Sequence, residues 1–241
     1  MSKAFKSSLK LLLREYKALT HHLLHVLKYP LNSFHLNWYS QNGEDGVLAE
    51  LLRRLEIRKG WVVEFGAWDG IWCSNTYHLI KTHPGFKAVY IEGDKPRFQD
   101  LLETASKHKP RIIPINAFVD ASGPNSLDAL LGKTEIPSDF EVLSIDVDST
   151  DYQIWEGLSQ YQPKLVIIEV NSSVPLGIEQ IHGNGTQGTS FTSMRSLGEK
   201  KGYACVWHRG NCIFVRNDLV EKILGTIPSR ADQDALFTFK K

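Results

Sequence analysis

Carboxylate side chains lie within or directly after short apolar segments at several points of this 241-residue chain. Glu64 lies in the apolar segment Trp61–Phe65, and Glu92, 28 residues later, directly follows the apolar segment Lys87–Ile91. In a nucleotide-binding sheet, an acidic residue that ends the second strand commonly accepts hydrogen bonds from a ribose diol. The carboxylate of Glu64 suits a ligand with a cationic end. The pattern therefore indicates a site for a nucleoside that carries a positive charge.

The turn after Glu64 separates two cofactor classes. It reads Gly66-Ala67-Trp68-Asp69-Gly70, and its two glycines let the backbone approach a ligand closely. It lacks the middle glycine of G-x-G-x-x-G, which admits a pyrophosphate, so a nicotinamide-dependent oxidoreductase is disfavoured. The sequence contains no phosphate-loop motif, so ATP or GTP hydrolysis has no support.

A third polar cluster follows the apolar segment Arg111–Ile115. Asn116 or Asp120 is placed to hydrogen-bond an adenine edge, and Phe118 to pack against the adenine face. Polar groups at the ends of three successive segments favour one shared binding site over unrelated surface residues.

Acidic residues also follow the next two apolar segments. Asp146, Asp148 and Asp151 share one turn, and Glu169 and Asn171 share the next. Such groups act as general bases, or they hold Mg²⁺ or another divalent metal, for which Asp146, Asp148, Glu169 and Asn171 are candidate ligands. In the alternative interpretation, Asp146 contacts the cofactor, Asp148 or Asp151 caps a helix beginning near Tyr152, and Glu169 alone is catalytic.

Two histidines and two arginines have less certain roles. His182, in the glycine-rich segment that ends at Gly188, is either a general base or an ordinary loop residue. His208 is predicted to be a turn residue. Arg195 and Arg209 are candidates for holding an anionic substrate, but they are predicted to be exposed side chains without that role. Cys73, with Trp68 and Trp72, is expected to form core or pocket wall.

These residues require a parallel sheet to bring them together. Short apolar strands alternate with helical patterns at about 44–58, 72–81, 95–107, 125–131 and 151–160. This alternation predicts a mostly parallel sheet with helices on both faces. A helix near Ser190–Lys201 then precedes an antiparallel hairpin formed by Tyr203–Trp207 and Asn211–Val215. The predicted strands are Trp61–Phe65, Lys87–Ile91, Arg111–Ile115, Glu141–Ile145 and Lys164–Ile168, followed by the hairpin.

A parallel sheet that ends in an antiparallel hairpin resembles the class I S-adenosylmethionine-dependent methyltransferases, which have a seven-stranded Rossmann-like sheet. Within that class, the motifs resemble those of the FkbM-type family. Two positions depart from the family pattern: Trp68 replaces an asparagine, and Asp146–Ser149 replaces Asp-x-Glu-Gly. The matching segments are Ser40–Gly46, Glu64–Gly70, Tyr90–Glu92, Asn116-Ala117 with Asp120, and Ser144–Asp148.

The resemblance implies an enzyme that methylates an oxygen of a sugar or another hydroxylated small molecule, with a small molecule or a glycan as acceptor. From their residue types and their places after the strands, the candidate catalytic residues are Asp146, Asp148, Glu169 and His182. The resemblance implies S-adenosylmethionine binding by Gln41, Glu64, Gly66, Ala67, Asp69, Gly70, Glu92, Asn116, Ala117 and Asp146. A second hypothesis is a non-catalytic module that keeps this Rossmann-like fold and is docked to a membrane surface or a partner by its basic N-terminal helix.

The polar segment Ser40–Gly46 precedes the first helix of this domain and has two interpretations. Ser40 or Asn42 caps that helix, with Glu44 and Asp45 favouring the positive end of its dipole. Alternatively, as the resemblance implies, Gln41 and Glu44 fold over the cofactor or the acceptor.

Residues 1–36 differ in composition from residues 37–241, which are expected to form the methyltransferase domain. They carry six Lys or Arg and one acidic residue, with leucines at helical spacing up to Pro30. This basic amphipathic helix is expected to pack on the domain, form a homodimer, or contact an anionic membrane surface. Its three histidines are interpreted as solvated.

The composition excludes several classes of protein. With 28 Lys+Arg and 27 Asp+Glu, the chain lacks the basic excess of a nucleic-acid binder. No apolar run is long enough to span a membrane. Three cysteines without a C-x-x-C pair and the lack of a signal-peptide pattern predict a cytoplasmic protein, either free or peripheral to the membrane.

Overall fold

The computed structural model describes residues 30–147, 149–183 and 185–238. The predicted N-terminal amphipathic helix, which ends before Pro30, lies outside the described residues. Its roles in membrane contact and in dimer formation therefore stay predictions. The described residues 30–36 pack on the domain. The 3-10 helix η1 (Leu31–Phe34) buries Leu31, and Leu36 exchanges backbone hydrogen bonds with Gly43 and Gly46 at 3.3 and 3.1 Å.

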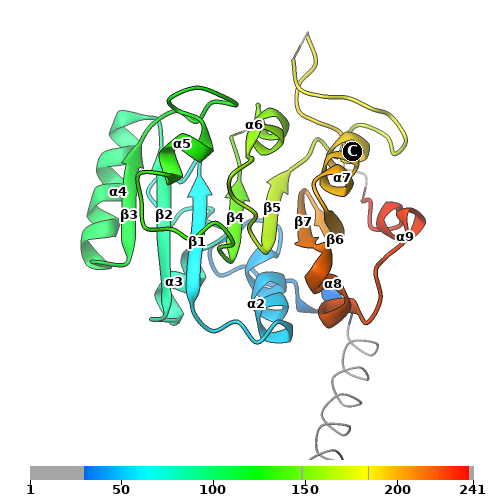
Figure 1. Cartoon of the computed structure of the whole chain (residues 1–241), viewed down its shortest axis with the longest axis horizontal. Coiled ribbons are helices and arrows are strands. Elements are labelled where there is room, and N and C mark those ends of the chain that lie inside the picture. The colour runs from blue at the N-terminus through cyan, green and yellow to red at the C-terminus, as the bar shows by residue number, and fades with distance from the viewer. Residues whose placement is uncertain (1–29, 148, 184, 239–241) are drawn as a thin grey trace, which may run out of the picture.

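One seven-stranded sheet forms the centre of the domain, with the order β3-β2-β1-β4-β5-β7-β6 (Figure 1). Strands β1 to β5 are parallel, and β7 runs antiparallel to both β5 and β6. The prediction of a mostly parallel, seven-stranded Rossmann-like sheet with a C-terminal antiparallel hairpin is confirmed. The strands are β1 (Gly60–Phe65), β2 (Phe86–Glu92), β3 (Ile112–Asn116), β4 (Val142–Ile145), β5 (Leu165–Glu169), β6 (Tyr203–Arg209) and β7 (Asn211–Arg216).

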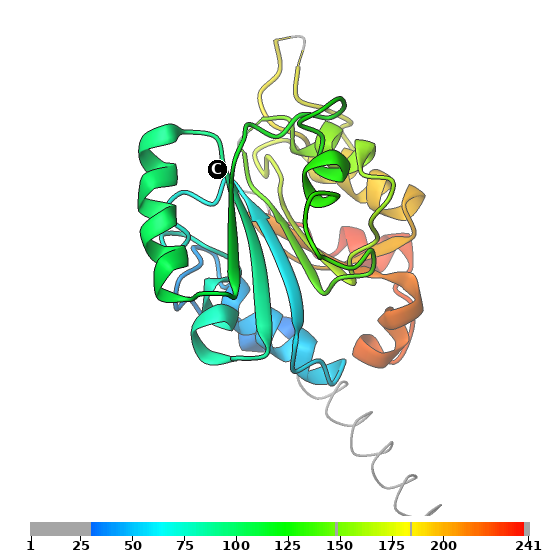
Figure 2. The same ribbon diagram turned by 60° about the vertical axis from the view of Figure 1, so that its left-hand side comes forward.

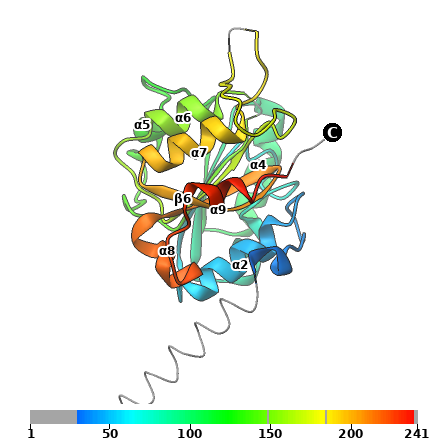
Figure 3. The ribbon, with the colours of Figure 1, turned by 90° about the vertical axis from the view of Figure 1, so that its right-hand side faces the viewer.

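Helices cover both faces of the sheet (Figures 2 and 3). Successive side chains of a strand point to opposite faces, so Val62 packs in one apolar cluster and Val63 in the other, both fully buried. This two-sided burial is why the strands read as continuous apolar runs. One face carries α2 (Glu44–Arg54), α3 (Tyr77–Thr82), α4 (Lys95–Lys107) and α8 (Asn217–Leu224). The other carries α5 (Leu127–Leu131), α6 (Asp151–Gly157) and α7 (Phe191–Lys200), followed by α9 (Arg230–Asp234).

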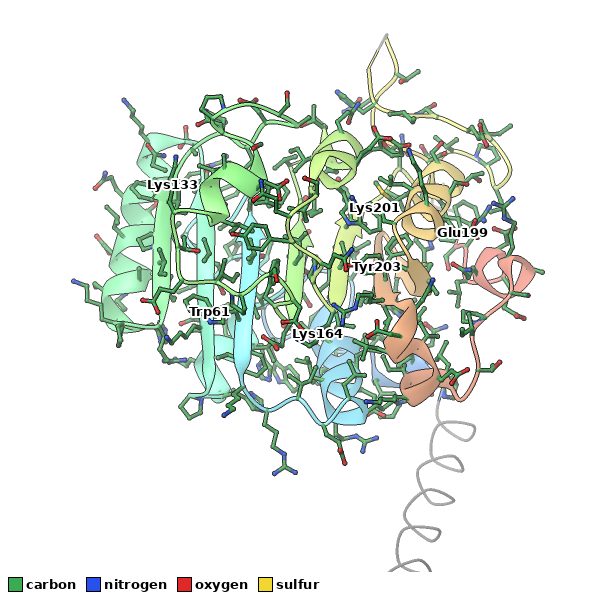
Figure 4. The ribbon with its side chains drawn as sticks, viewed as in Figure 1. Trp61, Lys133, Lys164, Glu199, Lys201 and Tyr203 are labelled. Carbon is green, nitrogen blue, oxygen red and sulfur yellow. The ribbon has the colours of Figure 1, made fainter. Side chains whose placement is uncertain are left out.

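The amino ends of the parallel strands are joined by a polar cluster at the lower edge of the sheet (Figure 4). The Glu141 carboxylate accepts hydrogen bonds from the Trp61 backbone N–H at 2.6 Å and from Lys164 Nζ at 3.1 Å. These contacts tie the starts of β1, β4 and β5 together. The opposite edge, where the parallel strands end, is left for the polar side chains that the sequence pattern places there.

Several predicted helices are shorter than their sequence patterns indicated, and two of them have an identifiable cause. The helix predicted over 44–58 ends at Arg54 because Glu56 adopts a left-handed backbone conformation with φ 59°. The helix predicted over 72–81 begins only at Tyr77, because residues 74–76 turn inward to hydrogen-bond Glu64. A tertiary contact therefore overrides the local helical pattern.

The terminal hairpin is tighter than predicted, which corrects the prediction for His208. Gly210 has φ 88°, and its neighbours Arg209 and Asn211 already pair with each other. His208 therefore lies within β6, is buried, and contacts Ser172 Oγ at 3.0 Å rather than forming the turn.

The prediction that Arg195 is exposed is also wrong. Arg195 lies on the buried side of α7 and pairs with Glu199 at 2.8 Å and Asp234 at 2.9 Å. Its charge is thus compensated inside the fold.

None of the helices in the described parts of the chain has the length and apolar character that crossing a membrane requires.

Candidate active site

A cleft of about 790 Å³ opens at the carboxyl edge of the parallel strands. Four of these strands each contribute one carboxylate to it: Glu64 from β1, Glu92 from β2, Asp146 directly after β4 and Glu169 from β5. Parallel strands that end at one edge necessarily bring such residues together.

The cleft contains about half of the residues predicted from the sequence. Those that line it are Gln41, Glu64, Gly66, Glu92, Ala117, Asp146 and Glu169. The predicted residues Ala67, Asp69, Gly70, Asn116, Asn171 and His182 are not among its lining residues. Further lining residues are Asn42, Trp68, Trp72, Cys73, Asn75, Gly93, Arg97, Phe118, Val119, Val147, Ser149, Thr150 and Asn211.

Glu64 is a buried carboxylate that organises the loop beneath the cleft. It accepts hydrogen bonds from Ser74 Oγ at 2.7 Å, Thr76 Oγ1 at 2.5 Å and the Asn75 backbone N–H at 2.9 Å. Burial raises the pKa of Glu64 above its ordinary value of 4.5, and these hydrogen bonds offset only part of that rise. The loop in turn places Asn75 in the cleft wall.

The turn after β1 depends on a glycine and a carboxylate. A Cβ on Gly66 would lie 2.0 Å from the Asp146 carbonyl oxygen, and φ at Gly66 is 71°, so this position requires glycine. Asp69 Oδ1 accepts the backbone N–H groups of Ile71 and Trp72 at 2.9 and 2.7 Å. Asp69 therefore shapes the wall from outside the cleft.

Glu92 joins the ends of neighbouring strands. Its Oε2 accepts the Trp68 backbone N–H at 2.8 Å and its Oε1 accepts the Asp94 N–H at 2.7 Å. The side chain of Asn116 donates to the backbone oxygen of Glu92 at 2.7 Å. Asn116 thus fixes the chain next to Glu92, although its own side chain lies outside the cleft lining.

Exposed aromatic rings flank this end of the cleft. Phe118 is 72% exposed, and its ring lies so close to Gly93 that a Cβ there would come within 2.3 Å of it. The Arg97 guanidinium stacks 3.5 Å from the centre of the Trp68 ring. Trp68, Trp72 and Cys73 are pocket wall, one of the two placements expected for them.

The turn after β4 is held by Asp151. Its two carboxylate oxygens accept the backbone N–H groups of Val147 and Ser149, each at 2.9 Å. Asp151 is the first residue of α6, and it binds the preceding turn rather than capping the helix. Asp148, which lies in the same turn, is outside the described residues.

The segment before α2 closes the other end of the cleft. Asp45 Oδ2 accepts three successive backbone N–H groups, those of Trp38, Tyr39 and Ser40, at 2.7–2.8 Å. These bonds fix the loop that carries Gln41 into the cleft wall. Glu44 is fully buried at the start of α2.

Asn171 and His182 serve the loop that follows β5. Asn171 Oδ1 accepts from the Ser173 backbone N–H at 3.0 Å and from Ser173 Oγ at 2.5 Å. His182 Nδ1 accepts the Gly188 N–H at 3.1 Å, and Gln153 Nε2 donates to the His182 backbone oxygen at 2.9 Å. The catalytic role of His182 stays a prediction.

The predicted metal site also stays a prediction. In the described parts of the chain, no group of three or more His, Cys, Asp or Glu side chains is arranged to hold a metal ion. The amide oxygen of Asn171 is engaged by Ser173. Asp148, the remaining candidate ligand between Asp146 and Glu169, is not described, so the complete ligand set is untested.

The cleft is strongly acidic. Its four carboxylates face one lining arginine, Arg97, which is stacked on Trp68. Burial raises the pKa of the Cys73 thiol, and the nearby carboxylates, Asp146 first among them, raise it further. Cys73 is thus a poor nucleophile at neutral pH. The electrostatics favour a cationic ligand over an anionic one.

No family model matches this sequence, and no curated protein matches it significantly. Solved structures with similar folds include M. capricolum TrmK bound to S-adenosyl-homocysteine, at 12% identity and TM-score 0.42, covering 68% of this chain and 65% of that one. This chain therefore spans slightly less than two thirds of that protein's length.

Two further solved structures are similar to this chain. A putative RNA methyltransferase from Pyrococcus horikoshii has 13% identity and TM-score 0.44, covering 76% of this chain and 91% of that one. A putative sarcosine dimethylglycine methyltransferase from Galdieria sulphuraria has 13% identity and TM-score 0.43, covering 76% and 73%. Similarity at this level does not extend to activity or substrate.

Proposed function

We propose that this protein is an S-adenosylmethionine-dependent methyltransferase that methylates an oxygen of a sugar or another hydroxylated small molecule. The observation that carries the proposal is the convergence of four carboxylates, one from each of β1, β2, β4 and β5, on a single cleft. An acidic cleft at the carboxyl ends of parallel strands suits a nucleoside with a cationic sulfur.

The lining residues fit the parts of this cofactor. Glu92 offers carboxylate oxygens to the ribose hydroxyls, and Phe118 offers an exposed ring to the adenine face. Gly66 lets the backbone approach the amino-acid end, beside Asp146. Glu64 contributes indirectly, because its hydrogen bonds hold residues 74–76, and with them the cleft-lining Asn75, in place.

S-Adenosylmethionine supplies an electrophilic methyl group on a positively charged sulfur. The chain's part is to hold an acceptor oxygen in line with that methyl group and to remove the acceptor proton. When bound, the cofactor would give up this methyl group to the acceptor oxygen and would leave as S-adenosylhomocysteine, with the electron pair of the broken carbon–sulfur bond on sulfur. We assign proton removal to Glu169 at the end of β5; Asp146, which directly follows the adjoining strand β4, lines the same cleft.

The FkbM-type assignment is a finer part of this proposal. It is supported by the order of the motifs from Ser40–Gly46 to Ser144–Asp148. Trp68, which departs from the family pattern, stacks with Arg97 at the cleft wall. We infer that this pair replaces contacts made by a smaller polar side chain.

Calorimetric titration tests the proposed function. We expect S-adenosylhomocysteine to bind with a Kd below about 100 μM, because its nucleoside matches the cleft. NAD⁺ is the control, since its pyrophosphate would face four carboxylates. Lack of S-adenosylhomocysteine binding at about 1 mM, or tighter binding of NAD⁺, contradicts the proposal.

A further inference from the structure

We propose that Asn42 and Asn211 form an acceptor subsite for an uncharged, hydroxyl-rich molecule and that Glu44 is the positioning residue that orients both amides. The inference rests on the proposed function, because it takes the molecule bound there to be the methyl acceptor. The sequence pattern indicates no site role for Asn211, and it favours Asn42 as a helix cap.

One buried carboxylate holds both amides. Glu44 Oε1 accepts from Asn211 Nδ2 at 2.8 Å and from Asn42 Nδ2 at 3.1 Å. Glu44 Oε2 accepts the Asn42 backbone N–H at 2.8 Å. Glu44 is fully buried, and no lysine, arginine or histidine in the described ranges forms an ion pair with it. Three N–H donors and the start of α2 stabilise its charge instead.

The chemistry of a carboxylate fixes which way each amide points. An ionised carboxylate only accepts hydrogen bonds, so both NH₂ groups must face Glu44. The amide oxygens of Asn42 and Asn211 are then the groups left to offer to the cleft that both residues line. Each asparagine amide could otherwise present either its oxygen or its NH₂ group to the cleft. Glu44 fixes both so that the oxygen, a hydrogen-bond acceptor, faces the cleft.

The subsite lies beside the proposed base. Asn211 is the antiparallel register partner of Glu169. It is the first residue of β7, directly after the turn at Gly210, and it lies next to the end of β5. A ligand there meets two amide oxygens and a carboxylate, all of which accept hydrogen bonds. Hydroxyl groups can donate to all three, whereas a carboxylate or phosphate has no donor to offer and is repelled by the charge.

Saturation-transfer NMR on the protein loaded with S-adenosylhomocysteine tests the charge preference. The probes are methyl β-D-glucopyranoside, glucuronic acid and glucose 6-phosphate, each titrated to about 50 mM. We expect the neutral glucoside to bind at least about tenfold more tightly than either anion. Equal or tighter binding of the anions, or no binding of the glucoside, overturns the inference.

Glu44→Gln tests the positioning role. Its amide NH₂ would face Asn42 and Asn211, whose side chains would turn over and present donors to the cleft. We expect the preference for the neutral glucoside over the anions to fall at least about tenfold, while the Kd of S-adenosylhomocysteine stays within about twofold. The matched control is Glu103→Gln, which removes one charge from an exposed position on α4. An unchanged preference in Glu44→Gln overturns the positioning role.

Asn211→Leu provides a second variant that leaves the charge of the chain unchanged. It replaces the amide with a branched apolar group of the same number of heavy atoms, which removes both the amide oxygen and the donor to Glu44, and we expect the glucoside to bind at least about fivefold more weakly. Unaltered glucoside binding overturns the subsite. Failure of the wild-type protein to bind S-adenosylhomocysteine instead contradicts the proposed function, so the two failures are distinguishable.

Discussion

Glu92 Oε2 accepts the backbone N–H of Trp68 at 2.8 Å, which joins the turn after β1 to the end of β2. The same carboxylate accepts the Asp94 N–H through its other oxygen. A carboxylate fixed in this way presents its remaining lone pairs to the cleft without reorganisation. The proposed function therefore assigns recognition of the ribose chiefly to Glu92.

Replacement of Glu92 by glutamine should therefore weaken cofactor binding. Hydrogen bonds to a charged acceptor are worth about 1.5–3 kcal/mol, so the Kd of S-adenosylhomocysteine should rise roughly 10- to 100-fold. Calorimetric titration of Glu92→Gln beside Glu103→Gln measures this effect. A Kd within twofold of the wild type would contradict the assignment.

Phe118 should stack on the adenine of the cofactor but add little to the folding stability of the protein, because its ring is 72% exposed. Base–aromatic stacking is worth about 1–3 kcal/mol, so Phe118→Ala should weaken S-adenosylhomocysteine binding by roughly 5- to 100-fold. Its urea midpoint should stay near that of the wild type. Ile227→Ala, at another exposed apolar side chain, is the control and should change neither quantity. Unaltered binding in Phe118→Ala would exclude the ring from the cofactor site.

Alanine substitutions at Gly66 and Gly177 should show how much of the cost at Gly66 comes from a steric clash rather than from backbone strain. Both have positive φ, 71° and 87°, but a Cβ at Gly66 meets the Asp146 carbonyl oxygen at 2.0 Å whereas nothing lies within 4 Å at Gly177. Gly177→Ala should cost about 1–2 kcal/mol of unfolding free energy, and Gly66→Ala at least about 3 kcal/mol. Urea unfolding measures both. Equal costs would show that the Asp146 backbone yields freely.

Glu64 should make stability depend on pH. Burial raises its pKa in the folded state above the ordinary value of 4.5, so the folded protein holds this proton more tightly than the unfolded chain does. The stability from this group is fully present below about pH 4.5 and is lost as the pH rises through the raised pKa.

Glu64→Gln removes this ionisation while keeping an oxygen for the Asn75 N–H. Relative to the wild type, the variant should therefore become progressively more stable as the pH rises from about 4 to 7. Urea unfolding of both proteins across that range measures the difference. A difference independent of pH would contradict the raised pKa.

The fold was predictable because its signals are local. Strands such as Trp61–Phe65 are buried on both faces and read as continuous apolar runs, which the structure confirms. The parallel direction of these strands then follows from the helical connections between them. The start of α3 was not predictable, because Glu64 draws Ser74 to Thr76 out of helical geometry through side-chain contacts.

The site was predictable in part for the same reason. Glu64, Glu92 and Asp146 lie at strand ends, and topology alone brings strand ends together. The contact between Glu44 and Asn211 spans 167 positions and involves a hairpin whose turn is one residue long, so no local pattern indicates it. The stacking of Arg97 on Trp68 joins a helix to a turn and carries no signal in the spacing of the residues.

The most direct test of the account is an experimental structure of the protein crystallised with S-adenosylhomocysteine. We predict that the ribose hydroxyls contact Glu92, that the adenine packs on Phe118, and that the sulfur lies between Gly66 and Glu169. A ligand bound on any other surface, or a cleft that stays empty at saturating ligand, would contradict the central claim that these strand ends form one cofactor site.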